Sequence, residues 1–300
     1  MRPAWSIIVF TTLAGAGQGL FLALFAADLA GRAARHFLFI GSALAALLCL
    51  AGLASSFFHL GRPSRSWRSA AMWRTSWLSR EVIVLPAFIA VVGTYSAAQL
   101  FSLHDWARAL GWAAVLLCVA LFVCTAMIYA CLKFLQEWHS PLTFINFFAL
   151  GCASGATAAA ALAAELQPAL LPACTALALA LGLIGFLLRA GTFVRNARLH
   201  PKSTTQSAIG AHNPRVRQIS QGQMGGSYNT REFFHGRSAA TVTAVRVAFL
   251  ILGFPLPAAL LYAGQPAIAF LVQYAGLLAE RWLFFADARH PQNLYYQAVA

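Results

Sequence analysis

The chain has 300 residues, of which 60% are hydrophobic and only 10% are charged, and its mean hydropathy is +0.69. A soluble domain carries about 25% charged residues, so this composition excludes an ordinary soluble protein. The net charge of +13 would suggest nucleic-acid binding in a soluble chain. Here the basic residues follow a membrane topology instead, and we expect no nucleic-acid partner.

Runs of about 20 apolar residues recur along the whole chain, each long enough to cross a hydrocarbon core of about 30 Å as a helix. The first run is longer than the core of a signal peptide, so we expect Met1 to be retained. The sequence predicts an all-α integral membrane protein with one domain over residues 1–300. Its eight transmembrane helices are expected at about 5–27, 37–59, 82–101, 111–132, 142–164, 168–189, 241–262 and 267–286.

The first span contains Gly15 and Gly19, within the stretch G-A-G-Q-G. A dinucleotide-binding loop has similar glycine spacing, but it follows a strand, and no strand is predicted before this stretch. Glycines four residues apart on a membrane helix let another helix approach closely. We therefore expect Gly15 and Gly19 to form a helix-packing surface.

Basic residues divide unequally between the two sides of the predicted membrane domain. Side A holds the N-terminus, the loops 60–81, 133–141 and 190–240, and the C-terminus. Seventeen Lys and Arg residues fall on side A and three (Arg32, Arg35 and Arg108) on side B, while Arg246 lies within the seventh span. Because cytoplasmic loops of membrane proteins carry an excess of Lys and Arg, both termini are predicted to be cytoplasmic, in a bacterial inner membrane.

The cysteines and histidines indicate no redox cofactor in this chain. The six cysteines lie within apolar spans and form no C-x-x-C pair, which favours a packing role over an iron–sulfur cluster. The eight histidines lie at span ends or in loops, whereas membrane haems are held by histidines inside facing helices. The histidine positions do not exclude a haem site at the side A surface, for instance near His59, His139 or His235. No metal site is predicted.

The second and third spans meet side A at two side chains that exchange protons. His59 ends the second span, and Glu81 opens the third, across a loop with five arginines and three tryptophans. Histidine titrates near neutral pH, and an acidic group at the mouth of a span is often functional. These groups suit reaction with a lipid-soluble quinone. They also suit a plainer hypothesis, in which His59 caps a helix and Glu81 pairs with an arginine.

Three stretches together resemble the membrane-anchor subunit family of dimethyl sulfoxide reductase. They are T-T-L-A-G-A-G-Q-G-L-F-L-A-L near the N-terminus, F-H-L-G-R-P with M-W-R-T-S-W-L-S-R-E, and E-R-W-L-F-F-A-D-A-R-H-P-Q-N-L-Y-Y from Glu280 to Tyr296. The resemblance implies an eight-helix anchor without its own redox cofactor, which exchanges electrons with ubiquinone or menaquinone. It also implies that His59 and Glu81 are tied to quinone reactivity, and we expect the neighbouring Arg62 to belong to the same quinone site. If these residues do not form the site, Gln18, Arg246, Glu280 and Arg281 are the other candidates.

The resemblance further implies two partners, a four-cluster iron–sulfur subunit and a molybdopterin catalytic subunit. The loop 190–240 is long and basic, and we expect it to be their docking platform; the alternative is a loop that binds lipid head groups. A short hairpin is predicted within it, pairing 216–219 with 227–229. The expected docking residues are Arg65, Arg68, Arg74, Arg215, Arg217, Arg231 and His235.

The direction of electron flow separates two branches of this hypothesis. Reductases of the dimethyl sulfoxide type have an exported catalytic subunit, whereas the charge distribution here turns the large loops to the cytoplasm. This favours the branch resembling cytoplasmic quinone-linked sulfite dehydrogenases. A quinol-oxidising anchor of a dimethyl sulfoxide or polysulfide reductase remains the alternative. A secondary transporter is a further hypothesis. Such proteins carry ionisable or broken-helix residues at mid-membrane, whereas here only Arg246 lies well within a span, and Pro255 and Pro257 interrupt the same helix. No inverted repeat is evident.

Overall fold

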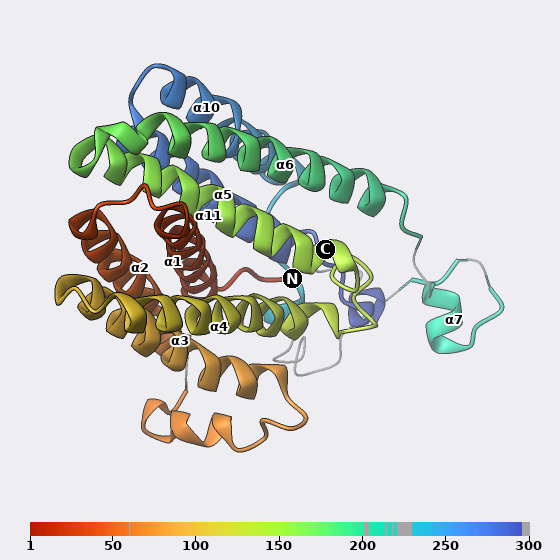
Figure 1. Cartoon of the computed structure of the whole chain (residues 1–300). Helices are drawn as coiled ribbons and strands as arrows, with labels where there is room; N and C mark the ends of the chain where they lie inside the picture. The colour runs from red at the N-terminus through yellow and green to blue at the C-terminus, as the bar shows by residue number, and fades with distance from the viewer. Residues whose placement is uncertain (60, 201–203, 214, 218, 221–229, 296–300) are drawn as a thin grey trace.

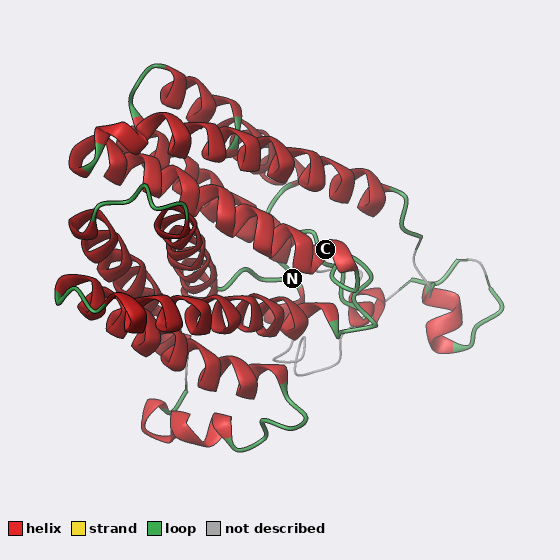
Figure 2. Cartoon of the chain, in the orientation of Figure 1, coloured by secondary structure: helices red, strands yellow, loops and turns green. Residues whose placement is uncertain are grey.

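The computed structural model describes residues 1–59, 61–200, 204–213, 215–217, 219–220 and 230–295. Within these residues the protein consists of helices and loops, with no strand, so the all-α prediction is confirmed (Figure 2). Eight helical segments of the described chain are long and apolar enough to cross a membrane. One half of the predicted hairpin, residues 227–229, lies outside the described residues.

Figure 1 shows the long helices of the bundle. In their order along the chain they are α1 (Trp5–Leu29), α2 (Arg35–Ser56), α3 (Trp77–Leu100), α4 (His104–Ala130), α5 (Pro141–Leu166), α6 (Leu171–Ala197), α9 (Ala239–Gly253) with α10 (Pro255–Tyr262), and α11 (Pro266–Ala286). Short helices lie in the connections: η1 (Phe57–His59), η2 (Pro63–Ala70), η3 (Pro168–Leu170), α7 (Thr205–Ile209), α8 (Thr230–Phe233) and η4 (Pro291–Tyr295).

Two helices differ from the expected spans in ways that matter for the site. Helix α3 begins at Trp77 because the Ser76 hydroxyl caps it by accepting a hydrogen bond from the backbone N–H of Ser79. Glu81 therefore lies in the second turn of the helix rather than at its opening. Helix α6 continues to Ala197, so Arg189, expected in the loop after the sixth span, lies inside the bundle and is only 4% exposed.

The seventh span is broken into α9 and α10 at Phe254, whose φ of −133° and ψ of −75° are not helical. Pro255 and Pro257 explain the break, because neither has the N–H that would continue the helical hydrogen bonds. Irregular backbone at this depth of a membrane protein requires cover by protein or a cavity. Here α11 packs along both pieces.

Side A of the bundle is tied together by hydrogen bonds between distant segments. The backbone N–H of Arg2 donates to the Glu232 carbonyl at 2.9 Å, and Trp138 Nε1 donates to the Phe284 carbonyl at 2.8 Å. Asn293 Nδ2 donates to the Phe233 carbonyl at 3.2 Å. The segment before α1, the α4–α5 loop, α8 and the segment after α11 thus form one face.

Helix α1 is at the centre of the bundle and packs against α2 and α5 (Figure 1). Its contact with α5 is made backbone to backbone at glycines. A Cβ added to Gly19 would lie 2.0 Å from the Gly151 carbonyl oxygen, and one added to Gly155 would lie 2.0 Å from the Gly19 carbonyl carbon. The predicted packing role of the α1 glycines is confirmed, and α5 supplies the matching pair, Gly151 and Gly155.

We expect Gly19→Ala and Gly155→Ala each to destabilise the protein, because a methyl group there must push two central helices apart. Overpacking of this kind costs about 1–3 kcal/mol or more. Gly93→Ala in α3 is the matched control, since a Cβ at Gly93 meets no atom within 4 Å. The effect is measured as a melting curve in detergent, in which size-exclusion chromatography reports the folded fraction after heating at each temperature. A Gly19→Ala melting curve equal to that of Gly93→Ala would contradict the packing role.

Candidate functional site

A buried carboxyl group lies between α3 and α4 near side A. Glu81 is only 3% exposed, and it accepts a hydrogen bond from the Thr125 hydroxyl of α4. The pairing arises because Glu81 is four residues into α3 and Thr125 is five residues from the end of α4, so the two antiparallel helices bring them to one level. An ionisable group in this setting is expensive to bury and is retained where it has a function.

A second set of buried charges joins α6 to α11. Arg189 Nε lies 3.0 Å from Glu280 Oε1, and Arg281 Nη1 lies 3.1 Å from Glu280 Oε2. All three side chains are at most 6% exposed. The Arg281 guanidinium also lies over the Phe147 ring, 3.6 Å from its centroid, which supplies a favourable cation–π contact.

Tyr129 of α4 connects the two sets. Its ring packs against Trp138 and Phe284, with centroids 5.1 Å apart in each pair. It lies within electrostatic reach of both Glu81 and Arg281. In the part of the chain that the structure describes, the buried charged side chains are Glu81, Glu280, Arg189 and Arg281, so the interior holds two acids and two bases.

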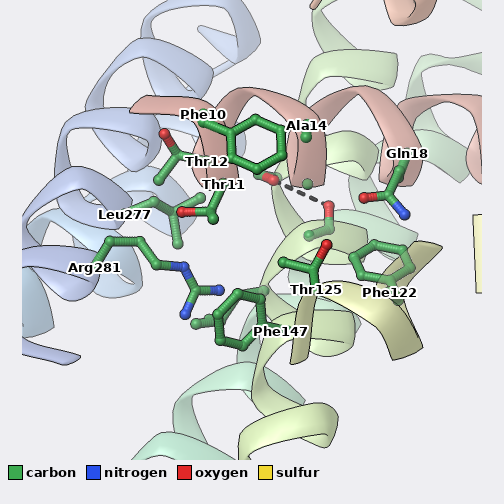
Figure 3. Close-up of a pocket in the computed structure, with 14 residues that line it drawn as sticks. Phe10, Thr11, Thr12, Ala14, Gln18, Phe122, Thr125, Phe147, Leu277 and Arg281 are labelled. Atoms are coloured by element: carbon green, nitrogen blue, oxygen red, sulfur yellow. Dashed lines mark hydrogen bonds between the residues drawn. The ribbon is translucent and has the colours of Figure 1, made fainter. Parts of the chain in front are cut away.

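Two small polar cavities lie along this set of residues. The first, of about 20 Å³, is lined by Thr11, Thr12, Gln18, Thr125 and Arg281 among others, and Arg281 and Gln18 enter it from opposite sides (Figure 3). The second, of about 10 Å³, shares Arg281 and Phe147 with the first and extends to Glu137 and Asp287 near side A. A volume of about 10–15 Å³ with polar partners suits a water molecule. The two cavities could each hold a water molecule, and together they extend from Thr125 to Glu137 and Asp287 near side A.

The sequence predicts a quinone site at His59, Glu81 and Arg62, but the structure does not bring Glu81 and Arg62 together. Glu81 points into the bundle, whereas Arg62 is exposed in the loop after α2. His59 ends η1, and its side chain lies outside the described residues. Phe58, next to His59, is 88% exposed, so this end of α2 offers an apolar surface to a lipid-soluble molecule.

The expected docking residues lie on side A, where the structure describes them. Arg65, Arg68 and Arg74 are exposed, and the guanidinium carbons of Arg68 and Arg74 lie 5.5 and 5.4 Å from the rings of Trp67 and Trp73. Arg215 and Arg217 are also exposed, while the Arg231 side chain lies outside the described residues.

His235 lies beside the Trp282 ring, with centroids 6.3 Å apart. Partial burial lowers the pKa of His235, although Asp287 opposes the shift. The shift favours the neutral ring, which would contact a partner through its ring face and hydrogen bonds.

Sequence reasoning missed Arg189, Thr125 and Tyr129 as site residues. Gln18, Glu280 and Arg281, which the sequence offered as second candidates, lie on the two cavities, whereas Arg246 pairs with Asp287 at 3.0 Å nearer the surface. The sequence offered only a weak signal for the pairing of Arg189 with Glu280, because Arg189 follows a long apolar run and could equally mark the end of the span. Over the described residues, no group of three His, Cys, Asp or Glu side chains is arranged to hold a metal.

Comparison with known proteins adds the family. Residues 1–286 match the family described as DMSO reductase anchor subunit (DmsC). A sulfite dehydrogenase subunit of Allochromatium vinosum is 51% identical over the full length of both chains. The family favours a membrane anchor over the transporter hypothesis. The chain thus belongs to the DmsC family of DMSO reductase anchor subunits, and it is a multi-pass membrane protein that anchors an oxidoreductase.

Proposed function

We propose that this protein passes electrons from a cytoplasmic sulfite-oxidising enzyme to the membrane quinone pool. The similarity to a sulfite dehydrogenase subunit supports this substrate, and the family supports a complex with catalytic and electron-transfer subunits. In the proposed complex these are a molybdopterin subunit and a four-cluster iron–sulfur subunit docked on side A. This chain supplies the quinone site and no redox centre of its own.

The buried Glu81 carboxyl, with its Thr125 partner, is the observation that carries the proposal. Reduction of a quinone takes up two electrons and two protons, so a proton donor must lie close to the head-group oxygens. Glu81 would give a proton to the head group and be recharged from side A through Thr125 and the two cavities. His59 would be the second proton donor, and Arg62 would orient the head group through its permanent charge.

The distribution of basic residues supports the proposed orientation of the chain. Arg189 and Arg281 are buried in the bundle and no longer count as side A loop residues. Fifteen basic residues then remain on side A against three on side B. This excess supports a cytoplasmic side A in a bacterial inner membrane, next to a cytoplasmic electron donor.

Glu81→Gln, His59→Ala and Thr125→Val should each lower quinone-coupled turnover, because each interrupts proton supply to the head group. General acid catalysis is worth about 10²–10⁴-fold, so a loss of at least about tenfold is expected for Glu81→Gln. Turnover with a soluble acceptor that takes electrons from the catalytic subunit should be unchanged. Glu165→Gln, the same change at an exposed side B position, is the control. Wild-type quinone turnover in Glu81→Gln would rule out the proton-donor role.

Topology is checked with reporter fusions. Fusions after Lys202 and after Ala300 should give a cytoplasmic signal, and a fusion after Asp105 should give a periplasmic one, because the basic residues lie on side A. A periplasmic signal after Lys202 would refute both the orientation and the cytoplasmic electron donor.

Docking is tested by charge reversal. The combined change of Arg65, Arg68 and Arg74 to Glu should reduce co-purification of the partner subunits, and the residual association should become less sensitive to salt. The matched control reverses Arg32, Arg35 and Arg108 on side B, and it should leave co-purification unchanged. Equal losses in the two triple variants would indicate a general folding defect rather than a docking face.

A further inference from the structure

A much larger cavity lies on the opposite side of the bundle, where the seventh span is broken. It has a volume of about 390 Å³ and is bounded by α5, α6, α9, α10 and α11. Its outer wall includes Leu183 and Ile251, which are 60% and 49% exposed, so it opens sideways into the hydrocarbon of the bilayer. None of its lining residues belongs to the Glu81 site.

The depth of the cavity excludes phospholipid head groups. The turn between α10 and α11 lies at side B. Pro255 begins α10 and is its eighth residue counted back from its side B end, and Gln273 is the eighth residue of α11 counted from its side B end. At about 1.5 Å per residue, both positions lie about 10–12 Å below side B. This is close to the middle of a hydrocarbon core of about 30 Å.

Most polar groups of this cavity are hydrogen-bond acceptors. Since Pro255 and Pro257 have no N–H, the carbonyls of Ile251 and Gly253 lack the donor that the fourth following residue gives in a helix. Gln273 Nε2 donates a hydrogen bond to the Gly253 carbonyl, with 3.4 Å between the nitrogen and the oxygen. This fixes the orientation of the amide.

The amide oxygen of Gln273 is then left over. The side chain is only 4% exposed, and among the described residues Gln273 Oε1 has no hydrogen-bond partner. The Thr157 hydroxyl, also at the cavity, uses its hydrogen on the Ala153 carbonyl at 3.0 Å and so offers only lone pairs. Leaving a buried acceptor without a donor is unfavourable, and a ligand with a hydroxyl group would supply the missing hydrogen bond.

We propose that this cavity is a binding site for the reduced, quinol form of the membrane quinone, separate from the site of electron transfer. A quinol has two hydroxyl donors on an apolar body, whereas the oxidised quinone offers only acceptors to a wall on which acceptors predominate. The cavity would hold product within the protein, away from the cytoplasmic site. The inference rests on the proposed function for the identity of the ligand, and on the cavity for its position.

The test uses membranes containing the full complex and a short-chain azidoquinone, photolysed in its reduced or oxidised form. Labelled peptides are identified by mass spectrometry. The reduced probe should label residues 250–261 about threefold to tenfold more than the oxidised probe, the range expected for one hydrogen bond. Gln273→Leu should remove this preference, and excess unlabelled short-chain quinol should compete.

Gly182→Leu should abolish labelling of 250–261 by filling the cavity, because a Cβ at Gly182 meets no atom within 4 Å. Gly191→Leu, on the same helix, is also free of neighbours and does not line the cavity, so it is the control. Equal labelling by both probe forms, unaffected by Gln273→Leu, would show an ordinary lipid groove and overturn the inference. Labelling of residues 77–95 reports the Glu81 site, so its loss alone would count against the proposed function only.

Discussion

Helices α1 and α5 touch backbone to backbone, and the arrangement of α6 and α11 around them depends on this contact. In a membrane the hydrophobic effect does not press helices together, so close packing of small residues must do so. With Gly19 against Gly151 and Gly155, α5 approaches closely enough for its other faces to meet α6 and α11. The first polar cavity lies beside this contact, and Gly15 and Gly151 belong to its lining.

The eight spans could be predicted from sequence because apolar length is a local property of the chain. The α1 glycines were also predictable, since their spacing alone indicates a packing face. Arg189 was not. A basic residue at the end of an apolar run indicates a boundary, and only Glu280, 91 residues later in the chain, makes its burial possible. The start of α3 was predicted too late in the chain. Arg80 indicated a span boundary just before residue 82, whereas the Ser76 cap starts the helix at Trp77.

For the candidate site, the sequence identified Glu81 but not its environment. It suggested a carboxyl group at the mouth of a span, whereas the structure has it inside the bundle, facing Thr125. The prolines at 255 and 257 were visible in the sequence as an interruption. That they leave an acceptor-lined cavity depends on Gln273 of α11, which adds a further acceptor oxygen, and on Gly276, whose missing side chain lets α11 lie against the backbone of Leu252 and Gly253.

The equal number of buried acids and bases links electron transfer to proton movement in the proposed reaction. When Glu81 is ionised, the four buried charges described above sum to zero. When Glu81 carries a proton, the interior has one excess positive charge, which stabilises an electron arriving on a nearby head group. Loading of the proton and arrival of the electron then favour each other by the same free energy. Such reciprocity needs no helix to move, and it would make a rigid bundle sufficient to keep the two transfers in step.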